Sequence, residues 1–378
     1  MKFIHLSDLH IGRRFKETSL IEDQKYILTQ ILKITDDEQP DAVIIAGDVY
    51  DKTVPSAEAV QLFDDFLYKL AQKKLQVFII SGNHDSAERL SFGSRLFGIS
   101  GVYVSPVYDG NVAPIVLHDE HGQVNVYMLP FVKPTHVRAA FEDTEIADYT
   151  DALRVAVDNM HVDPNLRNIL VTHQFVTGAE RSDSEELSVG GSDNVDVSVF
   201  DAFDYVALGH IHGPQKISRE TVRYCGTPLK YSFSECKHKK SVTVVEIKEK
   251  DNVNIRTVPL VPLRDMREIK GKYDDIANKD FYGSTNTGDY LHITLTDEED
   301  VPHALGKLRV IYPNLMQLDY DNARTRNSGF IDKAGDIEQK SPTELFAEFY
   351  EMQNNQPMSD KQKEFVLNLI EKIWEGEK

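Results

Sequence analysis

The chain has 378 residues, of which 41% are hydrophobic and 27% charged, the composition of an ordinary folded globular protein with room for two or three domains. Its formal net charge of −19 argues against a protein that grips DNA over a broad basic face, so any binding of nucleic acid must be local, assisted by metal ions or shared with a partner. The two cysteines, Cys225 and Cys236, are too few for a disulfide framework or a zinc site of cysteine ligands, and they favour a reducing cytoplasm. No apolar run approaches the length of a membrane span, and the run at the N-terminus is too short for a signal segment.

The N-terminal part of the chain alternates between short apolar runs and amphipathic stretches. The apolar runs are 3–6, 43–46 and 77–80, and the predicted helices between them are 21–35 and 57–72. Short runs rich in β-branched residues are typical of strands buried on both faces of a parallel sheet. The order strand, helix, strand, helix, strand therefore predicts an α/β fold with parallel strands and right-handed crossovers.

Side chains that can bind metal ions follow each of these runs, and they follow two more runs at 169–172 and 205–208. The residues at these five ends are Asp8, His10, Asp48, Asn83, His84, His173, His210 and His212. Because the carboxyl ends of parallel strands lie at one edge of a sheet, these side chains are expected to converge on one rim. Oxygen and nitrogen ligands without cysteine suit manganese, iron or zinc and could hold two ions, which the carboxylate of Asp48 could bridge.

Each of these residues also has a purely structural interpretation. Asp48 could cap a helix after its strand, and each histidine could be a half-buried imidazole with satisfied hydrogen bonds. Asp-x-His or Gly-Asp alone occurs by chance in many chains. Five successive runs that each end in ligand chemistry favour the metal site.

The middle of the chain carries weaker signals. Predicted elements are strands at 102–104 and 125–129, a rigid extended turn at 129–134 and a helix at 148–161. Lys133 and Arg138 could reach a substrate phosphate, and a surface role fits them equally well. The acidic segment 178–196 is interpreted either as a solvated loop or as a loop that becomes ordered over bound substrate.

Three more strands are predicted after the last of the metal-ligand runs, at 222–226, 241–247 and 253–258. We interpret them as a meander on the edge of a second sheet, which gives a two-sheet sandwich flanked by helices. Beyond them, residues 268–320 predict a small α+β unit with strands at 289–296 and 315–320 and a helix at 301–310. Residues 321–340 are polar and are interpreted as a linker.

Two helices with clear start signals follow the linker. Residues 341–344 and 359–362 both have the sequence of a capping box. The apolar residues of the second helix fall on one face: Phe365, Val366, Leu369, Ile370, Ile373 and Trp374. Two short helices cannot bury this surface between themselves, so they either dock on the body of the same protein or enter a groove of a partner.

The motifs of residues 1–212 resemble those of the calcineurin-like metallophosphoesterases: Asp-x-His, Gly-Asp, Gly-Asn-His-Asp, His and Gly-His-x-His, in the order of that family. The resemblance implies that a first ion is bound by Asp8, His10, Asp48 and His212. It implies that a second ion is bound by Asp48, Asn83, His173 and His210. His84 would be a catalytic histidine that faces the substrate.

The segment 226–235 is similar to the one that follows Gly-His-x-His in the SbcD-type DNA repair nucleases. This resemblance implies a manganese-dependent nuclease that cleaves DNA ends and hairpins as a homodimer, with magnesium, iron or zinc as alternative metals. The implied domains are a nuclease domain at 1–262, an α+β capping domain at 263–322, a linker at 323–340 and helices at 341–378 that bind the SbcC ATPase.

One residue departs from part of this family, and two other functions are compatible with parts of the pattern. Some related nucleases have a histidine where this chain has Asp51, which puts the exonuclease rate in doubt. A small-molecule phosphodiesterase or phosphatase could use the same site, although it would need neither the α+β unit nor the helical tail. A non-catalytic scaffold would be expected to lack ligands, and all seven ligand positions are filled.

Overall fold

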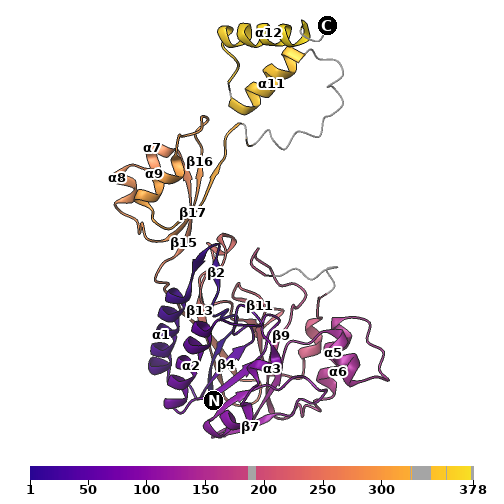
Figure 1. The fold of residues 1–378 in the computed structure, drawn as a ribbon. Coiled ribbons are helices and arrows are strands. Elements are labelled where there is room, and N and C mark those ends of the chain that lie inside the picture. The colour runs from indigo at the N-terminus through magenta and orange to yellow at the C-terminus, as the bar shows by residue number, and fades with distance from the viewer. Residues whose placement is uncertain (186–192, 324, 326–341, 355, 376–378) are drawn as a thin grey trace. The chain divides into compact units, whose positions relative to one another are not determined.

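The computed structural model describes residues 1–185, 193–323, 325, 342–354 and 356–375 (Figure 1). The chain divides into two compact units, Met1–Asp265 and Met266–Lys378, and each is described by itself. Most of the predicted linker 323–340 lies outside the described residues. Among the described helices, none has both the length and the apolar character needed to cross a membrane.

The first unit contains two six-stranded sheets. The first sheet has the order β14 (Val253–Pro259), β13 (Ser241–Ile247), β1 (Lys2–Leu6), β4 (Ala42–Ala46), β5 (Gln76–Ile80) and β6 (Val102–Val104). The second has the order β11 (Gln215–Ile217), β12 (Arg219–Tyr224), β10 (Tyr205–Gly209), β9 (Arg167–His173), β8 (Gly122–Leu129) and β7 (Ile115–Asp119). The two-sheet α/β sandwich is therefore confirmed.

The strands that carry the metal-ligand motifs are parallel, as predicted. In the first sheet, β1, β4, β5 and β6 run parallel, with Phe3 opposite Ala42 and Val43 opposite Val77. In the second sheet, β8, β9, β10 and β12 run parallel to one another. Both sheets thus bring several strand ends to one edge.

The predicted meander on the second sheet is wrong. Of the three strands predicted there, only β12 belongs to the second sheet. Strands β13 and β14 join the first sheet, with β13 antiparallel to β1. Six of the seven residues of β13 are buried, which marks it as an interior strand. Apolar periodicity shows that a strand has buried faces, but it does not reveal which neighbour the strand pairs with.

Helices flank the sandwich on two sides, with α1 and α2 on one side and α5 and α6 on the other (Figure 1). Their bounds are α1 Ile21–Glu38, α2 Ala57–Gln72, α3 Ala87–Leu90, α4 Ser94–Phe97, α5 Pro134–Ala140 and α6 Tyr149–Asp158. The prediction for α2 is confirmed in full. The helix predicted at 148–161 is shorter at both ends, because Asp148 is its N-cap, accepting a hydrogen bond from the backbone N–H of Asp151, and Asn159 is its C-cap. The α5 helix, at the end of the predicted extended turn, was not foreseen.

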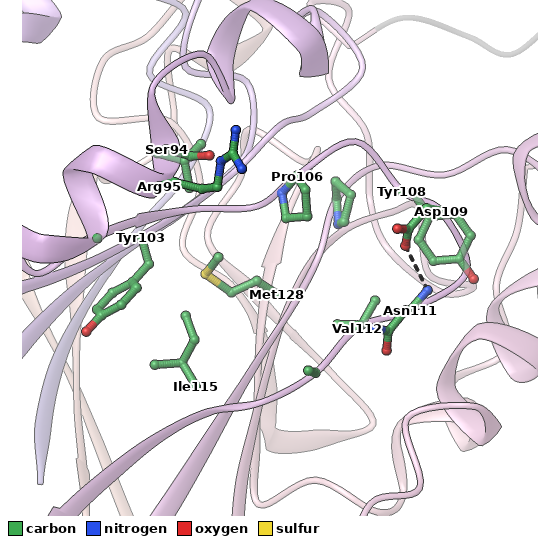
Figure 2. Close-up of a pocket in the computed structure, with 14 residues that line it drawn as sticks. Ser94, Arg95, Tyr103, Pro106, Tyr108, Asp109, Asn111, Val112, Ile115 and Met128 are labelled. Carbon is green, nitrogen blue, oxygen red and sulfur yellow. Dashed lines mark hydrogen bonds between the residues drawn. The ribbon is translucent and has the colours of Figure 1, made fainter.

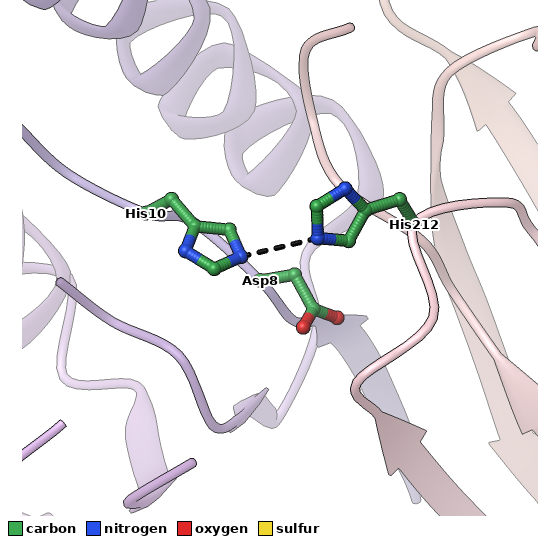
Figure 3. Close-up of side chains that lie close together, drawn as sticks. All are labelled: Asp8, His10 and His212. Carbon is green, nitrogen blue, oxygen red and sulfur yellow. Dashed lines mark hydrogen bonds between the residues drawn. The ribbon is translucent and has the colours of Figure 1, made fainter. Parts of the chain in front are cut away.

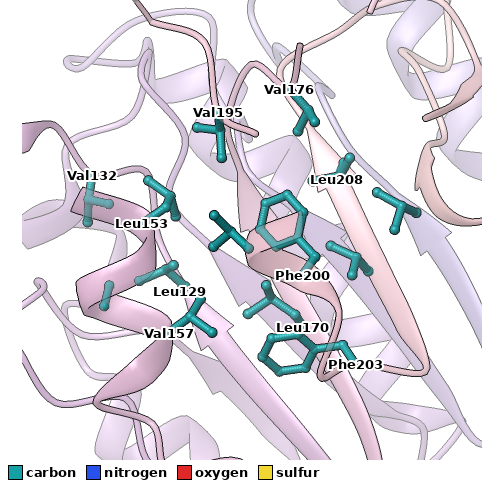
Figure 4. Close-up of a cluster of buried hydrophobic side chains, with 14 of the residues drawn as sticks. Leu129, Val132, Leu153, Val157, Leu170, Val176, Val195, Phe200, Phe203 and Leu208 are labelled. Carbon is teal, nitrogen blue, oxygen red and sulfur yellow. The ribbon is translucent and has the colours of Figure 1, made fainter. Parts of the chain in front are cut away.

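Two apolar layers hold the sandwich together. Between the sheets, residues such as Ile44 and Phe78 of the first sheet pack with Val171 and Ala207 of the second. On the outer face of the second sheet, a further cluster includes Leu170 and Leu208 with Leu153 of α6 (Figure 4). The site-bearing strands of the second sheet, β9 and β10, are therefore packed on both faces.

The second unit begins with a parallel three-stranded sheet of order β15 (Met266–Gly271), β16 (Tyr290–Leu295) and β17 (Leu315–Tyr320). Helices α7 (Tyr273–Ile276), α8 (Lys279–Tyr282) and α9 (Ala304–Ile311) complete it, and Ile293, Leu308 and Tyr312 are buried in its own core. The predicted α+β unit is confirmed as a fold.

The two predicted C-terminal helices are α11 (Pro342–Asn354) and α12 (Asp360–Glu375). At the start of α12, the backbone N–H of Ser359 donates to Gln362 Oε1 at 2.8 Å, which is one of the two bonds of a capping box. The capping residue Ser341 of the first helix lies outside the described residues.

Candidate metal centre

The seven predicted ligands lie together at one rim of the sandwich. They follow the carboxyl ends of five strands, β1, β4, β5, β9 and β10, or end them. Three groups of side chains have ligand atoms within 4.8 Å of one another: Asp8, His10 and His212; His10, Asp48 and His84; and Asp8, Asp48 and His173. Figure 3 shows the first group, with the two imidazole rings directed toward each other above the Asp8 carboxylate.

Asp48 is the centre of the arrangement. Its Oδ2 lies 3.3 Å from His173 Nε2, 3.7 Å from His10 Nε2 and 4.0 Å from His84 Nε2. Its Oδ1 accepts the backbone N–H of His84 at 2.9 Å. One carboxylate therefore faces His10 and His173, one expected ligand of each ion, as a bridging residue would.

The remaining ligands form one group on each side of Asp48. On one side, His10 Nε2 and His212 Nε2 are 3.2 Å apart. On the other side, Asn83 Oδ1 lies 3.0 Å from both His173 Nε2 and His210 Nδ1. The structure thus brings together the residues expected for each of the two ions.

Hydrogen bonds on the outer ring nitrogens fix the direction of two imidazoles at the rim, those of His173 and His84. His173 Nδ1 lies 2.9 Å from the carbonyl oxygen of Ala46, and His84 Nδ1 lies 3.2 Å from the carbonyl oxygen of Asp51. Since a carbonyl only accepts, each Nδ1 donates and each Nε2 is turned toward the centre. When the His173 ring is neutral, the lone pair of its Nε2 faces the centre, which is the usual orientation of a metal-binding histidine.

The backbone at the rim is held in unusual conformations. Asp8, His10, Asp48 and His210 have positive φ angles of 53°, 43°, 48° and 104°. Residues other than glycine rarely adopt this region, and such conformations gather at functional sites, where the surrounding structure enforces them. A Cβ added to Gly82 would lie only 2.1 Å from Asp48 Oδ1, so the loop after β5 can approach Asp48 only without a side chain.

The buried carboxyl groups of Asp8 and Asp48 favour a cation at the rim. Burial raises the pKa of Asp8 to about 6, and the neighbouring Asp48 adds to the effect. Burial lowers the pKa of His173, but Asp48 beside it outweighs this and raises it to about 9. In the chain alone, a proton on His173 therefore offsets the charge of Asp48, whose pKa is held below its usual range despite burial. Because divalent cations would take the place of this proton, the residues fit a metal pair.

From its place in the sequence, Asp85 could orient His84 or cap a helix. The structure shows a different role for Asp85. Its carboxylate instead accepts the backbone N–H groups of Val49 at 3.1 Å, Tyr50 at 2.9 Å and Gly82 at 3.0 Å. It therefore ties the loop after β4 to the loop after β5, while the short helix α3 takes its cap from the serine that follows Asp85.

Asp51, the position that departs from some relatives, forms an ion pair. Its Oδ1 accepts a hydrogen bond from Arg13 Nη1 at 2.8 Å, so its side chain is engaged with Arg13 while its backbone oxygen supports His84.

The two predicted phosphate contacts are placed differently. Lys133 lines a cleft of about 670 Å³ that Asn83 also lines, so it lies beside the metal centre. Arg138 does not line this cleft, and its Nε donates to the carbonyl oxygen of Ile146 at 2.9 Å. This geometry favours a structural role for Arg138. A second pocket of about 440 Å³, lined by residues such as Tyr103 and Met128, contains none of the predicted site residues (Figure 2).

Sequence reasoning missed two buried carboxylates near His212. Glu235 Oε1 lies 3.2 Å from His212 Nδ1, and Glu185 Oε1 accepts the backbone N–H of His212 at 2.7 Å. Glu185 belongs to the acidic segment 178–196, whose residues 186–192 lie outside the described part of the chain. At Glu185, the segment is buried and contacts the candidate metal centre, so the solvated-loop interpretation does not hold for this residue.

The comparisons with known proteins agree along the whole chain. The calcineurin-like phosphoesterase profile matches residues 1–214, and the SbcD C-terminal profile, described as the type 5 capsule protein repressor C-terminal domain, matches residues 262–354. The SbcD subunit of nuclease SbcCD from Staphylococcus epidermidis is 35% identical over 384 residues, which cover 100% of both chains.

Two solved structures are similar at low sequence identity. A dimetal phosphatase from Danio rerio is 12% identical with a TM-score of 0.43, covering 69% of this chain and 96% of its own. A protein of Thermus thermophilus is 12% identical with a TM-score of 0.38, covering 68% of this chain and 98% of its own. From the sequence profiles and the full-length relative, the chain belongs to the calcineurin-like phosphoesterases and, within them, to the family of the SbcD subunit of nuclease SbcCD.

Proposed function

We propose that this chain is the nuclease subunit of an SbcCD-type complex, a metal-dependent phosphodiester hydrolase that cleaves DNA ends and hairpins in DNA repair and recombination. It would act as a double-strand exonuclease and a single-strand endonuclease. The observation that carries the proposal is the convergence of a second carboxylate, an amide and four imidazoles around Asp48, in a chain with a full-length nuclease relative.

The proposed ligands of the first ion are Asp8, His10, Asp48 and His212. The proposed ligands of the second ion are Asp48, Asn83, His173 and His210. The support for this division is the grouping of side chains on the two sides of Asp48, with His10 facing His212 and Asn83 facing His173 and His210. Oxygen and nitrogen donors of this kind suit manganese, the metal we propose, and they would also accept magnesium, iron or zinc.

The ions, when bound, would polarise the phosphodiester and make a water acidic enough to attack phosphorus near neutral pH. The chain itself supplies a proton at His84. The Nδ1 of this ring is held by the Asp51 carbonyl, and its Nε2 lies at the rim, 4.0 Å from Asp48 Oδ2. A protonated Nε2 there can stabilise charge on the phosphate or donate to the leaving oxygen, which suits an imidazole near neutral pH.

The cleft beside the metal centre is the proposed path of the DNA strand. Lys133 and Arg89 line it together with Asn83. Cationic side chains at such a cleft would contact phosphates next to the scissile one, which positions the strand without reading its sequence. Local contacts of this kind are compatible with a chain whose net charge is −19.

We propose that α11 and α12 bind an SbcC-type ATPase. Among the described side chains of these helices, five large apolar ones are exposed, namely Phe346, Phe349, Phe365, Leu367 and Leu369. Exposed apolar faces on amphipathic helices are typical of segments that enter a partner's groove.

We also propose that the chain acts as a homodimer in the cytoplasm. Apolar side chains around α3 and α4 are strongly exposed, with Phe92 82%, Leu96 71% and Ile99 86% accessible, and a second copy could cover them. A Leu96→Glu variant is expected to sediment as a monomer if this face is used. The support for the cytoplasmic location is the sequence, in which two cysteines are too few for a disulfide framework.

One set of assays tests the function. The full chain is incubated with linear duplex DNA, hairpin DNA and a chromogenic diester, with and without manganese. We expect manganese-dependent cleavage of both DNA substrates, with binding to DNA ends that weakens steeply as salt rises. Hydrolysis of the chromogenic diester alone, with no cleavage of DNA, would favour the small-molecule phosphodiesterase instead.

A further inference from the structure

A buried ion pair lies directly behind His212, and the reaction outlined above does not use it. Glu235 is completely buried and Lys240 is 6% exposed. The Nζ of Lys240 donates a hydrogen bond to Glu235 Oε2. Lysine and glutamate are almost never buried in this way unless they are paired, and a buried pair is costly to desolvate, so its presence beside a candidate ligand needs a reason.

The pair holds His212 at its ring and at its backbone. Glu235 Oε1 lies 3.2 Å from His212 Nδ1 and accepts a hydrogen bond from it when Nδ1 carries the proton. Lys240 Nζ donates to the backbone oxygen of His212 at 2.9 Å. Ser184 Oγ, 2.8 Å from the same ring nitrogen, also donates to Glu235 Oε1, so the ring is held from a second direction.

Lys240 also decides which oxygen of Glu235 faces the ring. Its ammonium group binds Oε2 and the hydroxyl of Thr227, at 2.6 Å from Thr227 Oγ1. Oε1 is then the oxygen left for His212. The negative charge of Glu235 offsets the ammonium charge, which would otherwise oppose a cation at the neighbouring rim.

We propose that Glu235 and Lys240 are positioning residues for the ion on the side of Asp8, His10 and His212. They would fix the tautomer of His212 so that its Nε2 lone pair faces His10 and the rim, and the carboxylate would raise the basicity of that nitrogen. The proposal rests on the proposed metal-ligand role of His212. It predicts that the two ions differ in their dependence on this pair, because none of the hydrogen bonds of Glu235 and Lys240 described above reaches the residues of the second ion.

The test is manganese binding to the full chain and to its variants, measured by calorimetric titration and by the electron paramagnetic resonance spectrum of bound manganese. Glu235→Gln is expected to weaken one of the two ions by about 10–100-fold, the usual effect of losing a partner of a metal-binding histidine, and to leave the other ion unchanged. At intermediate manganese, its spectrum should be that of isolated ions, whereas the wild type should show a coupled pair.

A double variant protects the test against misfolding. Glu235→Gln combined with Lys240→Met removes both charges and so leaves no unpaired charge in the interior. It is expected to weaken the same ion. The control is Glu220→Gln combined with Lys216→Met, which removes an exposed glutamate–lysine ion pair between β11 and β12 and should change neither ion.

The outcomes separate this proposal from the proposed function. If the wild type binds two ions and the variants bind both as tightly, or lose both equally, the positioning role is overturned while the metal pair stands. If the wild type binds fewer than two ions, the metal pair itself is wrong and the positioning role is overturned with it.

Discussion

Asp8 and His173 at the rim of the sandwich are completely buried, whereas Phe365 on α12 is 67% exposed. At the rim, polar side chains are enclosed, His173 and His84 have partners on their outer ring nitrogens, and the backbone is held in rare conformations. On the C-terminal helices, apolar side chains face solvent. The contrast supports two of the proposals above: the metal centre is formed within this chain, and the C-terminal helices are the surface that binds a partner.

The strongest way to break this comparison is to change the centre of the rim. Asp48→Asn is expected to lower the rate of DNA cleavage by about 10³-fold, because a metal ion supplies several kcal/mol of transition-state stabilisation and Asp48 is the proposed bridge. The fold should persist, since the amide has the shape of the carboxylate. The measurement is the single-turnover rate in excess manganese, with the exposed Asp37→Asn on α1 as a control. Activity near that of the wild type would remove Asp48 from the site.

His84 separates catalysis from metal binding. His84→Ala is expected to lower the cleavage rate by about 10²-fold, the lower part of the range for a general acid, with manganese content unchanged. The control is His118→Ala, an exposed histidine on β7. Parallel loss of metal and activity in His84→Ala would make His84 a ligand and not a catalytic group.

A glycine at the rim and a glycine in the second unit should respond in opposite ways to the same change. Gly82→Ala would place a Cβ 2.1 Å from Asp48 Oδ1, so the free energy of unfolding should fall by about 1–3 kcal/mol, as for other overpacked sites. Nothing lies within 4 Å of a Cβ at Gly306 in α9, so Gly306→Ala should stabilise by about 0.5–1 kcal/mol. Denaturant unfolding followed for each unit measures both. A stable Gly82→Ala variant with normal manganese binding would show that the rim tolerates displacement.

The sequence could predict that the candidate ligands lie together because each has a local signal. Asp8, Asp48 and Asn83 come within three residues of the ends of short apolar runs, and parallel strands bring such ends together without further information. Glu235 carries no such signal, since it is 23 residues from His212 and reaches it only through the packed structure.

The same limit explains the misplaced strands. The run 241–247 shows that a strand is buried, but its pairing with β1 depends on contacts more than 200 residues apart, such as Phe3 opposite Val245. The role of Asp85 was missed for a similar reason, because the backbone N–H groups it binds come from the end of another strand.

The smallest effect on stability is expected on the C-terminal helices, where large apolar side chains are exposed. Phe365→Ala should change the free energy of unfolding by less than about 0.5 kcal/mol, because the side chain is 67% exposed and loses little packing. The same substitution at Phe78, which is completely buried between the sheets, should cost about 3–5 kcal/mol. Manganese-dependent cleavage of hairpin DNA by the isolated chain should be unchanged in Phe365→Ala, whereas capture of an SbcC-type ATPase should weaken by about 2 kcal/mol or more, as for an aromatic residue at the centre of an interface. If Phe365→Ala instead destabilised the second unit as Phe78→Ala destabilises the first, α12 would be packed on its own protein in solution, and the proposed partner surface would have to lie elsewhere.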